Sequence, residues 1–163
     1  MRESRTWKMI IRYSRGEEVF NMVSHIAGGG LAAAITALCV IKASFSQQVL
    51  GIVGTSVYGA MLVIYYSISS IYHGLAPRIG AKKVFRSLDG CAEFLLCAGT
   101  NTLFAFGVIG KASTALGWTY FGIIWGIAVT GILFNAFDPD KFKIVSVVLY
   151  LVIWWSLTAA VPI

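Results

Sequence analysis

Long apolar runs separated by short polar segments dominate the pattern along this chain. Five runs are each close to the roughly 20 residues that a helix needs to cross the hydrocarbon core of a bilayer. They cover residues 20–41, 49–75, 88–109, 114–137 and 144–162. The pattern therefore predicts an all-α integral membrane bundle of about five transmembrane helices.

The composition changes how the chain length of 163 residues is interpreted, because that length would also suit a soluble domain. Apolar residues make up 58% of the chain and charged residues only 12%. Too few polar residues remain to coat a soluble helix bundle. The first run begins after basic residues, as a signal peptide does, but it is long and further spans follow, so we expect it to be retained.

Lysine and arginine alternate between the two predicted sides of the membrane. The basic segments are the N-terminal arm (residues 1–16) and the second and fourth loops, whereas the first and third loops carry one lysine each, Lys42 and Lys111. Basic loops stay in the cytoplasm. We therefore expect a cytoplasmic N-terminal arm followed by a transmembrane domain over residues 17–163. Basic residues spread over membrane-flanking segments also argue against a nucleic-acid partner, and the bilayer itself is the expected one.

Small residues recur inside the predicted spans. Gly28, Gly29 and Gly30 follow one another in the first, and Gly122 and Gly126 form a G-x-x-x-G in the fourth. Such residues let helix backbones approach closely in lipid, so we interpret both sets as packing positions.

Polar and ionisable residues within the spans form three stripes at helical spacing. The first span opens with Glu18, Asn21 and His25, the second ends with Ser69 and His73, and the third begins with Asp89 and Glu93. The predicted topology puts all three stripes at the cytoplasmic side. Ionisable groups are costly in a membrane, so their convergence there favours a functional site.

The residues of these stripes are compatible with several roles. Imidazole nitrogen and carboxylate oxygen are good zinc ligands, and zinc can activate water against a carbonyl. Interhelical hydrogen bonding is an alternative role, as is simple solvation of the outermost groups at the membrane surface. A proton or ion pathway is a further alternative.

Three motifs, in order, resemble those of bacterial hemolysin III proteins, within the progestin and adipoQ receptor family. Residues 18–25 match E-x-x-N-x-x-x-H, residues 69–73 match S-x-x-x-H with its Tyr-His pair, and residues 88–100 match LD…FLLIAGT. Gly117-Trp118 and Tyr150…Trp154 fit the same pattern, so the resemblance covers roughly residues 16–156.

The resemblance implies seven transmembrane helices, a cytoplasmic N-terminus and a zinc site near the cytoplasmic face. It implies that His73 is a metal ligand and that Asp89 holds a zinc-bound water, with Ser69 alongside. Glu18, Asn21 and His25 match a motif with a supporting part. Gly90 stands where bacterial members often have histidine.

The sequence departs from the family pattern because it holds five of the seven helices and no H-x-x-x-H of the last one. His25 and His73 are its only histidines. A metal site here would need other ligands, such as His25, Glu93 or a second chain.

The resemblance implies a zinc-dependent amide hydrolase acting on lipid, in the cell membrane of a bacterium (the inner membrane). One alternative is a membrane-perturbing cytolysin or channel-like protein, and another is a non-catalytic sensor or structural membrane protein. The sequence leaves the substrate and a homo-oligomeric state open.

Overall fold

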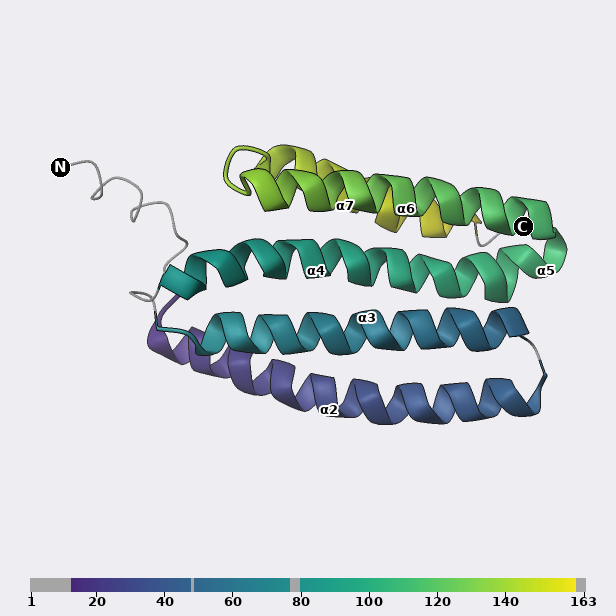
Figure 1. Cartoon of the computed structure of the whole chain (residues 1–163), viewed down its shortest axis with the longest axis horizontal. Helices are drawn as coiled ribbons and strands as arrows, with labels where there is room; N and C mark the ends of the chain where they lie inside the picture. The colour runs from purple at the N-terminus through teal and green to yellow at the C-terminus, as the bar shows by residue number, and fades with distance from the viewer. Residues whose placement is uncertain (1–12, 48, 77–79, 161–163) are drawn as a thin grey trace.

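A computed structural model describes residues 13–47, 49–76 and 80–160 of the chain. Its long helices are α2 (Arg15–Phe45), α3 (Val49–Gly74), α4 (Gly80–Phe104), α6 (Thr114–Phe137) and α7 (Lys143–Ala160). A π-helical turn, η2 (Ala105–Ile109), and the short α5 (Gly110–Ala112) prolong α4. The helices run side by side, with α3 between α2 and α4, and with α6 and α7 against the other side of α4 (Figure 1).

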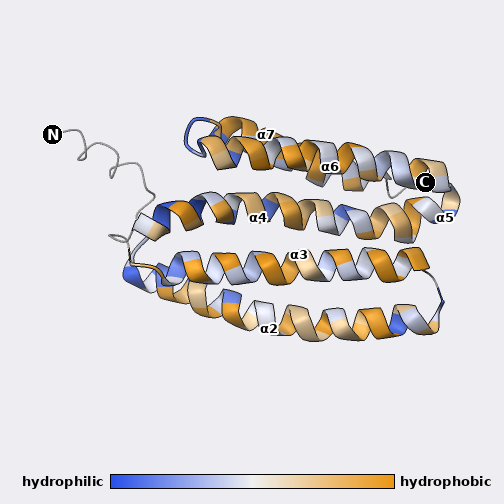
Figure 2. Cartoon of the chain, in the orientation of Figure 1, coloured by the Kyte–Doolittle hydropathy of each residue, from blue (hydrophilic) through white to orange (hydrophobic). Residues whose placement is uncertain are grey.

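The structure confirms an all-α membrane bundle. Four helical segments are long and apolar enough to cross a bilayer, namely α2, α3, the continuous stretch Gly80–Ala112, and α6. The fifth, α7, is apolar but shorter, with 18 residues. Hydrophobic residues recur along the whole length of the helices, as membrane-spanning segments require (Figure 2).

Two helices, α2 and α4, begin several residues before the apolar runs because capping and polar first turns lie outside the hydrocarbon. α2 begins at Arg15, where the Ser14 hydroxyl accepts a hydrogen bond from the Glu17 N–H and the Glu17 carboxylate accepts one from the Ser14 N–H, a capping box. α4 likewise begins at Gly80, eight residues before the predicted run. Residues 1–12 of the predicted N-terminal arm lie outside the described residues.

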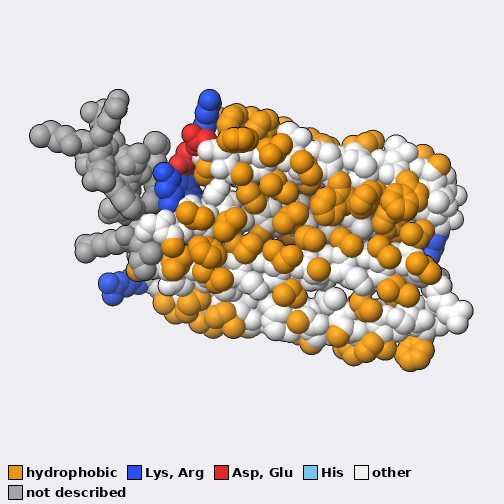
Figure 3. Space-filling model, in the orientation of Figure 1, with side chains coloured by type: hydrophobic (Ala, Val, Ile, Leu, Met, Phe, Trp, Pro, Cys, Tyr) orange, Lys and Arg blue, Asp and Glu red, His pale blue; other side chains and the backbone are white. Residues whose placement is uncertain are grey.

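Charged side chains gather at one end of the bundle, which we call the basic end: α2 and α4 begin there, and α3 and α6 end there (Figure 3). The guanidinium of Arg86 contacts both carboxylate oxygens of Asp140, at 2.5 and 3.3 Å, and so joins α4 to the α6–α7 connection. The second and fourth loops therefore share one side of the membrane. The positive-inside rule assigns that side to the cytoplasm.

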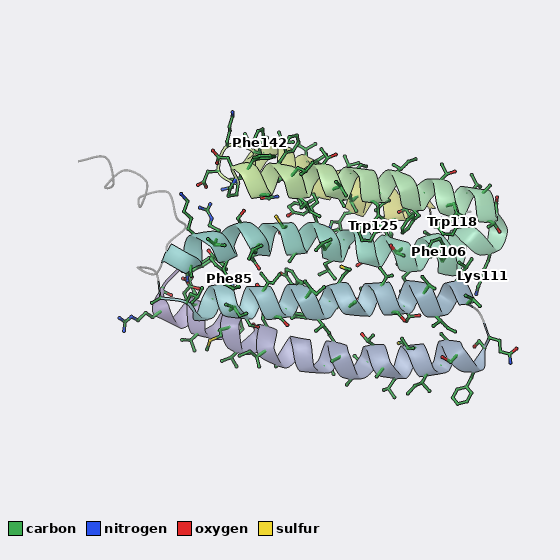
Figure 4. All side chains as sticks on the ribbon, viewed as in Figure 1. Phe85, Phe106, Lys111, Trp118, Trp125 and Phe142 are labelled. Carbon is green, nitrogen blue, oxygen red and sulfur yellow. The ribbon has the colours of Figure 1, made fainter. Side chains whose placement is uncertain are left out.

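A buried apolar core lies between α4, α6 and α7. A buried cluster there comprises Phe94, Cys97, Ala98, Ile124, Ala128 and Ile153. Phe94 is fully buried and stacks on Tyr150 with ring centroids 4.0 Å apart. Towards the far end, Phe106 and Trp118 pack edge to face, and the indole N–H of Trp125 donates to the Thr102 hydroxyl at 2.9 Å (Figure 4).

The two sets of glycines behave differently. Gly28 and Gly29 lie against Tyr66, where an added Cβ would come within 2.9 and 3.2 Å of its side chain, so packing confirms these two positions. No described atom would come within 4 Å of an added Cβ at Gly30. Gly122 and Gly126 lie on the exposed face of α6, and no described atom would come within 4 Å of an added Cβ at either. Among the described residues this G-x-x-x-G therefore makes no packing contact, because α6 turns Ile124 and Ala128 towards α4 instead, and its packing against a further helix stays a prediction.

Candidate functional site

The two histidines meet near the basic end of the bundle. His25 comes from the first third of α2 and His73 from the last turn of α3, and their ring centroids are 5.7 Å apart at an interplanar angle of 70°. The rings of Tyr65 and Tyr66 on α3 lie 5.9 and 5.6 Å from His25. The antiparallel pairing of α2 and α3 thus brings together residues 48 positions apart in the sequence.

Asp89 joins the histidines from α4. Its carboxylate lies near the Ser69 hydroxyl and within electrostatic range of both imidazoles. Ser69 is 1% exposed. Two buried polar atoms of this group, Asp89 Oδ1 and His25 Nδ1, have no hydrogen-bond partner among the described residues. Burying such an atom without a partner costs free energy, so two of them in one place are unusual.

On the side nearer the membrane surface, Glu18 bridges His73 and Lys82. His73 Nδ1 lies 2.8 Å from Glu18 Oε2, and Lys82 Nζ donates to Glu18 Oε1 at 2.6 Å. The side chain of His73 is 7% exposed, that of Glu18 13% and that of Lys82 4%. α2, α3 and α4 each contribute one member of this ionic cluster.

The remaining predicted site residues lie at its margins. Asn21 is half-buried on α2, one turn from Glu18 and from His25. Glu93 lies one turn beyond Asp89 on α4, next to the Tyr150 hydroxyl and exposed in this chain. Glu93 lines a largely apolar cavity of about 400 Å³, whose wall also includes Tyr65 and Tyr66.

The donor set is suited to zinc in kind, although it is incomplete. Two imidazoles bound to one zinc have ring centres about 5 to 6 Å apart, given Zn–N bonds of about 2.0–2.1 Å, and the His25–His73 separation falls in this range. Within the described residues, however, no group of three His, Cys, Asp or Glu side chains is placed to hold a metal ion. Zinc binding therefore stays a prediction.

Sequence reasoning missed Lys82, which entered only as a loop charge. It is the most buried charged side chain of the ionic cluster. The signal was its spacing: Lys82 is seven residues before Asp89, so both lie on one face of α4. Gly90 faces the opposite way, and an added Cβ there would lie 3.0 Å from the Asn135 side-chain oxygen on α6.

Comparisons with known proteins agree with the motifs. The chain is 32% identical over 146 residues to Hemolysin-3 of Bacillus cereus, covering 89% of this chain and 64% of the relative. It is 29% identical over 145 residues to the Hemolysin-3 homolog of Bacillus subtilis (strain 168), covering 89% and 66%. The chain thus spans about two thirds of the length of these relatives. No solved structure matches.

The family model described as haemolysin-III related matches residues 13–163, which include every helix of the structure. The chain is a multi-pass protein of the cell membrane, and it belongs to the haemolysin-III-related family.

Proposed function

We propose that the His25–His73–Asp89 cluster forms part of a zinc centre that hydrolyses an amide bond in a lipid. One observation carries the proposal: Asp89 Oδ1 and His25 Nδ1 are buried without hydrogen-bond partners, in a place that both share with His73. A bound cation would give both atoms a partner. Imidazole nitrogen with carboxylate oxygen is a donor combination that suits zinc.

The residues divide into ligands and groups that act on the substrate. His73 would bind the ion, and Asp89 would bind the ion or the water molecule on it. His25 would supply a further nitrogen ligand. Zinc, when bound, supplies a Lewis acid that polarises a carbonyl oxygen. The Asp89 carboxylate orients a water molecule and accepts its proton as the water oxygen bonds to the amide carbon. The Ser69 hydroxyl donates a hydrogen bond to the carbonyl oxygen. The proton that Asp89 accepted from water passes to the departing amine nitrogen as the C–N bond breaks.

A lipid substrate is supported by the cavity that adjoins the cluster. Tyr65 and Tyr66 pack against His25 and also line the cavity of about 400 Å³. Its wall is largely apolar and lies within the membrane span, so an acyl chain suits it better than a water-soluble substrate. Glu93 adds one carboxylate to this wall, within reach of a polar headgroup.

The complete centre needs donors beyond the described cluster, since no group of three acidic, histidine or cysteine side chains among the described residues is placed to hold an ion. The family resemblance implies two histidines of an H-x-x-x-H, whereas these 163 residues hold only His25 and His73. We propose that Glu93 or a second copy of the chain supplies the ligands that His25, His73 and Asp89 do not.

Zinc content tests the proposal directly. The chain is purified in detergent with a tag that contains no histidine, and bound zinc is measured by elemental analysis. We expect zinc in the wild type and its loss in His73→Ala and Asp89→Ala. Ser67→Ala, an exposed position on α3 two residues from Ser69, is the matched control and keeps its zinc. Absence of zinc from the wild type, or equal zinc in His73→Ala, contradicts the proposal.

Membrane perturbation is a second candidate function, favoured by the name Hemolysin-3 of the Bacillus cereus relative. The test is release of a trapped dye from vesicles that contain the purified chain. Retention of the dye at high protein load counts against it. A sensor or structural role without chemistry predicts that His73→Ala and Asp89→Ala change stability but neither zinc content nor dye release.

A further inference from the structure

We propose that Lys82 is a positioning residue for His73, acting through Glu18. This inference rests on the zinc centre proposed above, because it concerns which ring nitrogen of His73 is available to a metal. Nothing in the motifs that define the site includes Lys82. The geometry points to it instead.

Lys82 is buried to a degree that lysine rarely reaches unless it is paired. Its side chain is 4% exposed although the residue lies in the first turn of α4, next to the membrane surface. The adjacent Lys83 is exposed, as a basic residue at this depth normally is. Burial of the side chain therefore distinguishes Lys82 from Lys83, which carries the same charge.

Three contacts fix the Lys82 ammonium. It donates to Glu18 Oε1 at 2.6 Å and to the Leu75 carbonyl oxygen at 3.0 Å, and it lies 5.0 Å from the centre of the Tyr72 ring. Leu75 directly follows α3, so the ammonium ties the end of α3 to the start of α4. Glu18 is thereby held from one side by a group that can only donate hydrogen bonds.

The other carboxylate oxygen of Glu18 then determines the state of His73. Oε2 lies 2.8 Å from His73 Nδ1, and an ionised carboxylate can only accept, so Nδ1 carries the proton. The lone pair of the neutral ring is left on Nε2. Histidine ligands of metals commonly have this arrangement, with a carboxylate on one nitrogen that fixes both the tautomer and the ring orientation.

Loss of the Lys82 ammonium removes one of the two contacts that hold the Glu18 side chain. Glu18 is close enough to the membrane surface, at 13% exposed, to turn towards water instead. His73 Nδ1 then lacks an acceptor, and the Nε2–H tautomer, which has no lone pair for a metal on that nitrogen, becomes populated. Lys82 thus acts on the site through Glu18, and its own hydrogen bonds go to Glu18 and to the Leu75 carbonyl.

Nitrogen-15 NMR of the imidazoles tests this without any metal. The full chain, labelled at histidine and free of metal, is reconstituted in lipid nanodiscs under alkaline conditions at which imidazoles are neutral. The chain has only two histidines, so His25→Gln assigns the signals of His73. Wild type, Lys82→Met and Lys82→Arg are compared, with Lys83→Met as the matched control for loss of one positive charge.

We expect the wild type to show the Nδ1–H pattern for His73, Lys82→Met to lose it, and Lys82→Arg and Lys83→Met to keep it. Lys82→Gln, which retains a polar end, should show the same loss and replaces Lys82→Met if that variant lacks native helicity. Zinc affinity, measured by competition with a chelator, should fall about tenfold or more in the variants that lose the pattern.

An Nε2–H pattern in the wild type overturns the proposal, as does an unchanged His73 pattern in folded Lys82→Met and Lys82→Gln. An equal change in Lys83→Met also overturns it, because the effect would then be one of net charge. If the wild type binds no zinc, the zinc centre fails, but the tautomer comparison still decides the role of Lys82.

Discussion

The two sides of α4 bury different kinds of polar groups. Towards α2 and α3, the buried or half-buried groups are ionisable, and they include a histidine pair, a carboxylate with an unpartnered oxygen and the ionic cluster of Glu18, His73 and Lys82. Towards α6 and α7, the buried polar contacts are neutral, and the Arg86–Asp140 ion pair lies at the more exposed basic end. Among the neutral contacts, Tyr120 bonds to Asn101 and Ser156, and Trp125 bonds to Thr102.

The difference separates helix packing from chemistry. Neutral hydrogen bonds between helices in lipid contribute modestly, on average about 0.6 kcal/mol, and the α4–α6–α7 side combines them with a buried apolar cluster. Ionisable groups cost more in a membrane and are a poor way to hold helices together. Ala32 is the only buried residue of α2, so packing does not explain the charges on that side.

The largest expected effect comes from breaking the ionic cluster. Glu18→Leu leaves the buried Lys82 ammonium without its carboxylate, which should lower the free energy of unfolding by about 3 kcal/mol or more. Zinc content should fall in the same variant. Glu17→Leu is the control: Glu17 is exposed and acts only in the capping box, so its loss should cost about 1 kcal/mol or less and leave zinc unchanged.

Unfolding of both variants is measured in mixed detergent micelles, with zinc determined on the same samples. Equal effects of Glu18→Leu and Glu17→Leu would remove the distinction between the buried cluster and the exposed cap.

A smaller effect, on stability alone, is expected from the packed side. Phe94→Ala removes a fully buried ring that stacks on Tyr150 and fits against Gly131, where an added Cβ would lie 2.3 Å from the ring. Because lipid is as apolar as the protein interior, the transfer term of this substitution is small and the cavity left by the ring accounts for most of its cost. We expect the free energy of unfolding to fall by about 2 kcal/mol. Phe137→Ala, at a position 82% exposed, should change little. A loss of zinc from Phe94→Ala would show that the two sides are not independent.

Much of the fold was accessible from the sequence because bilayer thickness and the positive-inside rule act on composition alone. The apolar runs predicted the helices, and the spacing of polar residues placed Glu18, His25, His73 and Asp89 near one end of the bundle. The ends of the helices were less accessible. The capping box at Ser14 lies outside the hydrocarbon and therefore outside the apolar pattern.

Two features depended on tertiary structure that no local pattern encodes. The direction in which α6 faces decides whether Gly122 and Gly126 pack, and it is set by the fit of Ile124 and Ala128 against α4. The burial of Lys82 depends on the packing of α2 and the end of α3 against the start of α4, which brings Glu18 and the Leu75 carbonyl to its ammonium. Loop charge alone did not distinguish Lys82 from Lys83.

The smallest expected effect comes from the neutral hydrogen bonds on the packed side. Tyr120→Phe removes the hydroxyl that bonds to Asn101 Oδ1 and Ser156 Oγ, and the rest of the ring stays in place. Because the amide nitrogen of Asn101 remains bonded to the Cys97 carbonyl at 2.8 Å, only one acceptor loses its partner. The loss of stability should be about 0.6–1 kcal/mol, with zinc content unchanged.

Thr119→Ala on the same helix is the control for Tyr120→Phe, because the Thr119 hydroxyl bonds only to the Ala115 carbonyl within α6. Its effect should be smaller still. If Tyr120→Phe cost as much as Glu18→Leu, neutral hydrogen bonds would hold this bundle as strongly as buried charges do. The charged side would then be no more exceptional than the packed one, and the case that its cost reflects a site would lose its main support.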